Sequence, residues 1–168
     1  MARYRVDDRA SQLVVRARSS IHDTNTTWSV ITGDIEADPD TLEQEGARAT
    51  FAVDMTEFDA GDWLKNRKLR KDFQLEKHPQ ARFTLDALSD VVRDGDQFSA
   101  TATGTLDWHG RQVQISVSGR GVLNKSEIDV TGRFELDIRE LGLSPPKFFI
   151  FKVESEVAVE VTLRARVA

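Results

Sequence analysis

Strict alternation of apolar and polar residues recurs along this chain and constrains its fold more than any other feature. From residue 98 to residue 108, one face consists of apolar or small residues: Phe98, Ala100, Ala102, Gly104, Leu106 and Trp108. The residues between them are Ser, Thr and Asp. Because successive side chains of a β-strand point to opposite faces, this period of two predicts a strand with one buried and one solvated face.

The same period of two marks seven further segments. They span residues 13–17, 31–37, 47–55, 81–85, 113–119, 128–138 and 153–167. Together the alternating segments predict eight half-buried strands, and residues 4–7 predict a short additional one.

Three short polar connections separate the later strands. Asp94-Gly95-Asp96, His109-Gly110 and Asn124-Lys125-Ser126 have the composition of hairpin turns, in which glycine tolerates a positive φ. Consecutive hairpins make an antiparallel meander, and closing such a sheet on itself removes its unpaired edges. We therefore expect an all-β protein, an antiparallel up-and-down barrel of about eight strands.

One segment breaks the alternation. Residues 59–73 lack β-branched side chains and are rich in Leu, Lys and Arg, which favour helix. Leu69 and Phe73 are four residues apart and share a helical face. The segment predicts one α-helix of about four turns, inserted between the strands at 47–55 and 81–85 and ended before His78-Pro79. Residues 38–46 read as a polar loop, and no linker divides residues 1–168, so we expect a single domain.

The composition excludes several classes of function. The chain has no cysteine, which rules out disulfide scaffolds, thiol catalysis and zinc sites built on cysteine. Its net charge of −5 argues against nucleic acid as a partner, because phosphates require a basic surface. The sequence has no run of 18 apolar residues, and its N-terminus is charged where a secretory leader needs an apolar core. We expect the chain in the cytoplasm, or in the periplasm if a leader has been removed.

Four groups of residues resemble, in the same order, the motifs of one known family. They are residues 11–15 (SQLVV); 66–73 (NRKLRKDF) followed by 77–83 (KHPQARF); 104–110 (GTLDWHG) with Val113; and 141–146 (LGLSPP) followed by 153–157 (VESEV). Their order and spacing are similar to those of the YceI-like family, over nearly the whole chain. The resemblance implies a lipocalin-like barrel that binds lipid or polyisoprenoid, but it identifies no ligand-contacting side chain.

The apolar face of the strands is the candidate ligand site. An eight-stranded barrel encloses an interior that side chains just fill or that holds one small ligand. The small residues on this face leave volume unless the aromatic residues reach across, and the resemblance favours a hollow barrel. The candidate interior residues are Phe51, Val53, Phe83, Phe98, Ala100, Ala102, Leu106, Trp108, Phe134 and Leu136. Such an interior suits a long hydrocarbon, since each CH₂ removed from water contributes about 0.8 kcal/mol.

At the rim of the barrel, the candidate ligand contacts are His22, Trp63 and Phe149. No pair among the three histidines has the spacing of metal ligands, so we expect no metal site. The sequence contains no G-x-S-x-G, and the carboxylates on the predicted strands fall on the solvated face. We therefore assign no catalytic residue.

Two other segments suggest partners. The expected helix carries a basic cluster made of Lys65, Arg67, Lys68, Arg70 and Lys71. This cluster is either a solvated helix face or a surface that docks peripherally on anionic lipid headgroups. Residues 148–151 (FFIF) follow two prolines, which cannot pair within a central strand, and we expect a lid over the interior or a homodimer contact.

Three functions fit this sequence. The first is a non-enzymatic binding or carrier module for a polyisoprenoid, an isoprenoid quinone or a fatty-acyl lipid, with no other cofactor required. The second is a ligand-free structural or protein-interaction module on the same barrel. The third is an enzyme that uses a rim histidine and a carboxylate. The size of the inward side chains separates the first two.

Overall fold

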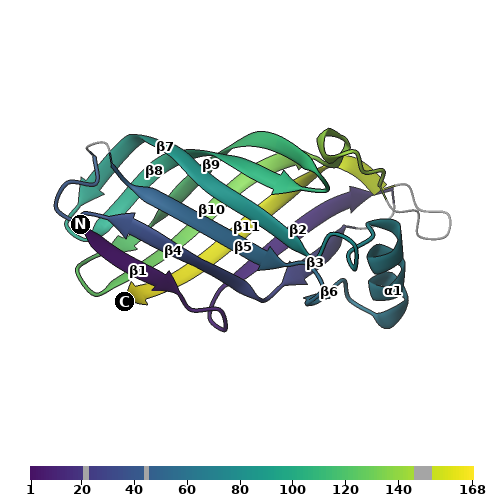
Figure 1. Ribbon diagram of the computed structural model, residues 1–168. Helices are drawn as coiled ribbons and strands as arrows, with labels where there is room; N and C mark the ends of the chain where they lie inside the picture. Colours follow the sequence, from purple (N-terminus) through teal and green to yellow (C-terminus); the bar gives the residue numbers. More distant parts are fainter. Residues whose placement is uncertain (21–22, 44–45, 146–152) are drawn as a thin grey trace.

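A computed structural model shows a closed antiparallel barrel with one helix at one end (Figure 1). The structure describes residues 1–20, 23–43, 46–145 and 153–168. His22, Phe149 and the rest of the 148–151 segment lie outside the described residues. The lid and homodimer interpretations of that segment therefore stay predictions.

The described residues form eleven strands in one sheet. They are β1 (Ala2–Val6), β2 (Gln12–Ser19), β3 (Thr24–Trp28), β4 (Ile31–Ala37), β5 (Arg48–Asp54), β6 (Phe58–Asp59), β7 (Gln80–Asp94), β8 (Gln97–Trp108), β9 (Arg111–Leu123), β10 (Glu127–Asp137) and β11 (Val153–Val167). The barrel runs β1-β4-β5-β7-β8-β9-β10-β11 and closes through pairing of β1 with β11.

Three positions in the barrel wall are each shared by two successive strands. β1 and β2 both pair with β11. β4 then pairs with β1 and β3 pairs with β2. In the same way, β5 pairs with β4 and β6 pairs with β3. If β1 and β2, β3 and β4, and β5 and β6 are each counted as one position, the eight positions follow one another around the barrel in the order of the sequence. The closed barrel of eight strands confirms the predicted up-and-down architecture.

The helix is confirmed but is shorter than predicted. α1 (Trp63–Asp72) begins after Asp62, whose side-chain Oδ1 accepts a hydrogen bond from the backbone N–H of Lys65 at 2.9 Å. Asp59, expected inside the helix, instead pairs with Thr27 in the β3–β6 ladder. This side-chain N-cap starts the helix, so its ten residues make about three turns.

A short 3₁₀-helix, η1 (Ile138–Leu141), follows β10 and was not predicted. Asp137 ends the strand, because its side chain accepts a hydrogen bond from the backbone N–H of Arg139 at 3.0 Å. The Arg139 guanidinium also bonds this carboxylate and holds the pKa of Asp137 at about 2. Gly142 ends η1 with a φ of 77°, a conformation that glycine adopts without strain.

Candidate functional site

A cavity of about 200 Å³ lies inside the barrel. Its lining includes residues from the ends of β4, β8 and β9 that lie opposite α1, on the side of the molecule where the two chain termini lie (Figure 1). We call this part of the barrel the hollow half, and the part near α1 the helix end. Every lining residue is apolar or glycine, so within the described residues no ionisable side chain lines the cavity.

Seven of the ten predicted interior residues line the cavity. They are Phe51, Val53, Phe83, Phe98, Ala100, Ala102 and Phe134. The other three, Leu106, Trp108 and Leu136, belong to the apolar core but are not part of the cavity lining. The cavity lining also contains residues that are not among the ten predicted ones, including Ile31, Ile35, Ala37, Leu42, Ala47, Ala49, Leu85 and Leu88.

Small side chains explain why this half of the barrel is hollow. The cavity lining contains seven alanines and glycines: Ala37, Ala47, Ala49, Ala100, Ala102, Gly119 and Gly132. A Cβ added to Gly119 would meet no atom closer than 3.6 Å. A Cβ would therefore fit at this position in ordinary van der Waals contact with Val130, and no neighbouring ring occupies the space.

Aromatic rings do fill the space above two other glycines. The Phe51 ring covers Gly33 and the Phe83 ring covers Gly104, so a Cβ at either glycine would collide with a ring. The two rings stack with centroids 6.2 Å apart and an interplanar angle of 10°. The two outcomes that the sequence left open, filled and hollow, thus both occur, at different positions of the same barrel.

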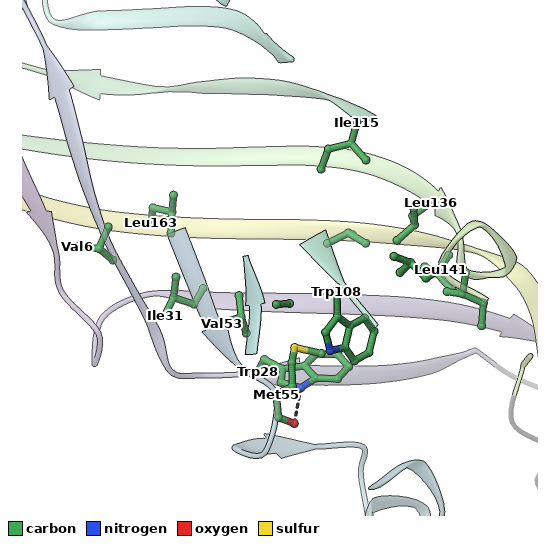
Figure 2. Close-up of a cluster of buried hydrophobic side chains, with 14 of the residues drawn as sticks. Val6, Trp28, Ile31, Val53, Met55, Trp108, Ile115, Leu136, Leu141 and Leu163 are labelled. Carbon is green, nitrogen blue, oxygen red and sulfur yellow. Dashed lines mark hydrogen bonds between the residues drawn. The ribbon is translucent and has the colours of Figure 1, made fainter. Parts of the chain in front are cut away.

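At the helix end, Trp28, Met55 and Trp108 lie close together within the buried apolar core (Figure 2). Trp28 is 4% exposed and donates its indole N–H to the backbone oxygen of Met55 at 3.2 Å. Trp108 donates its indole N–H to the backbone oxygen of His78 at 2.9 Å and packs edge-on against Phe73. These side chains close the barrel at the helix end, because buried indole N–H groups that find partners fix the ring positions.

Two histidines lie beside Trp108, outside the cavity. The rings of His78 and His109 are 4.0 Å apart, and His109 also contacts Trp108 edge-on. Burial lowers the pKa of His109, proximity to His78 lowers it further, and a hydrogen bond to the Phe73 backbone opposes both effects. The pair lies at the helix end and lines no part of the cavity.

The opposite end of the barrel is closed as well. Tyr4 is fully buried, and its hydroxyl donates a hydrogen bond to the backbone oxygen of Asn124 at 2.6 Å. Leu42 and Leu123 are 6% and 2% exposed and line the cavity beneath this contact. Leu42 comes from the segment 38–46, whose composition predicts only a polar loop.

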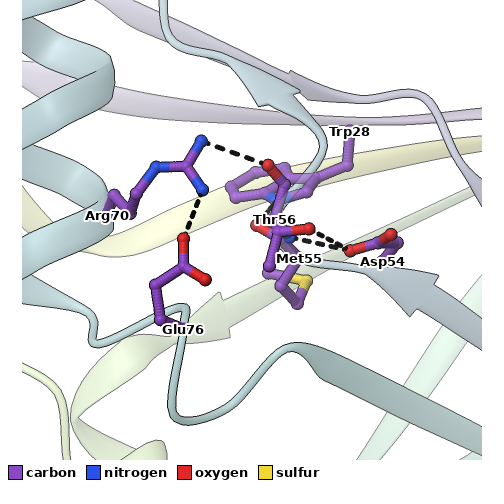
Figure 3. A network of polar contacts seen from close by, with 6 residues as sticks. All are labelled: Trp28, Asp54, Met55, Thr56, Arg70 and Glu76. Atoms are coloured by element: carbon purple, nitrogen blue, oxygen red, sulfur yellow. Dashed lines mark hydrogen bonds and ion pairs between the residues drawn. The ribbon is translucent and has the colours of Figure 1, made fainter.

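The surface of α1 combines basic and apolar side chains. Trp63 and Leu64 are 68% and 51% exposed, which places Trp63 outside the cavity lining. Lys68 forms an ion pair with Asp72 at 3.1 Å. Arg70 forms an ion pair with Glu76 at 2.8 Å and donates to the backbone oxygen of Thr56 at 3.2 Å (Figure 3).

Arg70 therefore fastens α1 to the loop between β5 and β6. Its guanidinium also lies 5.1 Å from the centre of the Phe58 ring. Thr56 is held in turn by Asp54, which accepts hydrogen bonds from the Thr56 hydroxyl and backbone N–H. Among the five predicted basic surface residues, Arg67 and Lys71 are exposed, and Lys65, Lys68 and Arg70 are half-buried.

Residues 1–20, 23–43, 46–145 and 153–168 contain neither a metal-binding cluster nor a membrane-spanning helix. Among these residues, no group of three or more His, Asp or Glu side chains is arranged to hold a metal ion. No helix in the described part of the chain has the length and apolarity needed to cross a membrane.

The fold is a closed, lipocalin-like barrel of eight strands around an apolar cavity. Residues 4–165 match the family model of the YceI-like domain. The chain therefore belongs to the YceI-like family, as its sequence motifs indicated.

Several solved structures have the same fold. The crystal structure of BcnA from Burkholderia cenocepacia has 21% sequence identity and a TM-score of 0.78, and the match covers 95% of this chain and 98% of that one. A polyisoprenoid-binding domain from Saccharophagus degradans, implicated in plant cell wall breakdown, has 16% identity and a TM-score of 0.77, with both chains fully covered. A Campylobacter jejuni YceI protein has 14% identity and a TM-score of 0.67, with 84% and 83% covered. No curated protein matches the chain significantly.

Proposed function

We propose that this protein is a non-enzymatic binding or carrier module that holds one apolar ligand in the hollow half of its barrel. The ligand classes are a polyisoprenoid, an isoprenoid quinone and a fatty-acyl lipid. The observation that carries the proposal is the cavity inside the barrel, whose lining is entirely apolar. The polyisoprenoid-binding domain among the structural neighbours supports the first of these classes.

The energetics favour such a ligand. An engineered apolar cavity of about 150 Å³ stays dry and binds benzene, so a cavity of about 200 Å³ accepts an apolar segment as it stands. Each CH₂ that leaves water adds about 0.8 kcal/mol. A long chain needs more room, which requires either movement of lining side chains such as Phe98 or extension of the chain beyond the cavity.

A titration tests this proposal. Protein stripped of lipid is mixed with a fluorescent fatty-acyl probe, and unlabelled prenol, quinone and fatty acid then compete for the site. We expect saturable binding of one probe per chain, and the strongest competitor identifies the ligand class. Absence of saturable binding by the folded protein would contradict the proposal and favour a ligand-free structural or interaction module.

We also propose that the exposed surface of α1 docks on an anionic membrane. Trp63, Arg67 and Lys71 recur every fourth residue and lie on one face of the helix, with Leu64 beside them. Tryptophan suits the membrane interface, and each basic residue near an anionic surface contributes about 1 kcal/mol. This patch is narrower than the five-residue cluster, because Lys68 and Arg70 already form ion pairs.

A further inference from the structure

Both ends of the barrel are shut in the described part of the chain. Trp28, Met55 and Trp108 are each at most 8% exposed and close the helix end. Tyr4, Leu42 and Leu123 close the other end. A ligand that reaches the cavity needs an entrance through the barrel wall or a movement of one of these closures.

The barrel wall separates between β5 and β7. The two strands pair only from Thr50, opposite Thr84, to Asp54, opposite Gln80. Beyond Thr84, toward the end where the termini lie, β7 pairs with β8 alone.

Two irregularities in β7 account for this separation. The register between β7 and β8 shifts between Leu85 and Ala87 and again between Ser89 and Val92. Each shift bends a strand locally and increases its twist. β7 therefore follows β8 and leaves β5, whose first residues pair only with β4.

A surface groove lies over this separation and shares part of its lining with the cavity. The shared residues are Ala47, Ala49, Leu85 and Leu88. The rest of the groove lining has five polar side chains, Glu43, Arg48, Thr50, Thr84 and Asp86, together with Gly46 and Ala87. The same four apolar side chains thus face the cavity on one side and the groove on the other, with no strand ladder between them.

A second separation lies between β9 and β10, which pair only from Ser118 to Leu123 and from Ile128 to Arg133. There, near the helix end, Leu136, Leu141 and Leu143 are each at most 8% exposed. Buried leucines therefore occupy this region, whereas the β5–β7 separation opens onto a groove.

We propose that the β5–β7 separation is a lateral portal and that the ligand is a single-chain amphiphile. Its apolar chain lies in the cavity, and its polar end stays in the groove. The proposal rests on the function proposed above, that the cavity holds an apolar ligand. The cavity lining offers no polar side chain to a buried polar end, and such an end is costly to bury without a partner.

The groove supplies those partners. The Thr50 and Thr84 hydroxyls both donate and accept hydrogen bonds, and Arg48 forms no ion pair within the described part of the chain. A chain too long for the cavity also finds apolar surface in the groove at Ala47 and Leu88.

Tethering the two strands tests the portal. Because the chain has no cysteine, Arg48→Cys with Ala87→Cys introduces the only two thiols, one on each side of the groove. A bifunctional maleimide joins them, and mass spectrometry verifies the bridge. Stopped-flow fluorescence then gives the entry and exit rates of the fatty-acyl probe. Compared with the same double-cysteine protein before bridging, which already lacks the Arg48 guanidinium, we expect both rates to fall at least tenfold, with the dissociation constant changed less than either rate.

Two matched tethers serve as controls. Thr103→Cys with Ser116→Cys bridges directly opposed residues of the closed β8–β9 ladder. Ser116→Cys with Glu135→Cys bridges the second separation, between β9 and β10. We expect neither tether to slow the probe. Unchanged rates with the β5–β7 tether, or slowing by the β9–β10 tether alone, would overturn the portal while leaving the proposed function intact.

The orientation of the ligand has its own readout. Two acyl probes carry the same bulky fluorophore, one at the polar end and one at the far end of the chain. We expect the first to bind at least tenfold more tightly, because only its fluorophore remains in the groove. Equal affinity would overturn the proposed orientation, and failure of both probes to bind the untethered protein would overturn the function and the portal together.

Discussion

The two ends of this barrel are built from the same strands but are packed in opposite ways. β8 contributes Trp108 to the dense helix end and Ala100 and Ala102 to the hollow half. At the helix end, indole rings with bonded N–H groups fill the interior, and in the hollow half, alanine and glycine leave it empty. The helix end therefore contributes packing that stabilises the fold, and the hollow half leaves room for the proposed ligand.

The largest expected effect comes from truncating a ring at the helix end. Trp28→Ala removes a buried ring and its hydrogen bond to Met55, and should lower the free energy of unfolding by about 3–5 kcal/mol. Phe98→Ala is the matched change in the hollow half. It should cost about 2 kcal/mol less, because the Phe98 ring already borders empty space. Urea unfolding measures both, and equal costs would contradict the division of the barrel.

Enlarging an alanine reverses the comparison. Ala102→Trp should fill the cavity and cost less than about 1 kcal/mol, while weakening binding of the acyl probe at least tenfold. The control, Ala81→Trp, places the same ring in packed surroundings and should cost about 1–3 kcal/mol or more. Urea unfolding and probe titration measure these effects. If Ala102→Trp strongly destabilises the protein, and the parent protein does not bind the probe, the barrel is filled.

Acid should weaken the helix end specifically. Burial and proximity to His78 lower the pKa of His109, so the folded state disfavours the proton that the unfolded state binds. This contribution to stability is complete above the unfolded pKa of about 6.5 and is lost as the pH falls below that value. The charged groups near the pair are Lys68, Asp72, Lys77, Arg82 and Asp107.

His109→Asn tests this effect. Asparagine tolerates the positive φ of 56° at this position and does not titrate. The urea concentration at the unfolding midpoint should decrease for the parent when the pH is lowered from 7 to 5, and it should decrease less for the variant. A variant that loses as much stability as the parent would place the acid sensitivity elsewhere in the molecule.

The smallest expected effect concerns the surface of α1. Binding to anionic vesicles should weaken as salt rises past about 0.15 M, because ions screen exposed charges. Replacing Arg67 and Lys71 with Gln, and Trp63 with Ser, should abolish sedimentation with vesicles and leave probe binding in the hollow half unchanged. Lys125→Gln, at a distant turn, is the charge control. No sedimentation of the parent even at low salt would leave α1 as a solvated face.

Much of the fold followed from the sequence because each long strand buries one face. The alternation located all eight long strands, but it missed β3 and β6. In β3, two residues on the buried face are Thr24 and Thr26, whose polar side chains hide the pattern, and β6 has only two residues. For β7 the predicted strand stopped at Leu85, where the register with β8 first shifts.

The candidate site was predictable only in part. Alternation identifies which residues face inward, and seven of the ten chosen line the cavity. It does not give the height of a residue along the barrel, so Trp108 and Leu136 were grouped with Ala102. Leu42 could not be found either, because a single apolar residue in an acidic loop has no periodicity. The portal arises from a loss of pairing between two strands, which neither strand encodes alone.

The central claim is that the hollow half holds an apolar chain. Native mass spectrometry of the protein purified from its own host tests it most directly, with Ala102→Trp measured in parallel. We predict that the parent retains added mass above its 18.9 kDa chain, that denaturing conditions release it, and that the variant carries none. A parent that stays bare after purification and after incubation with a lipid extract of the host would contradict the account.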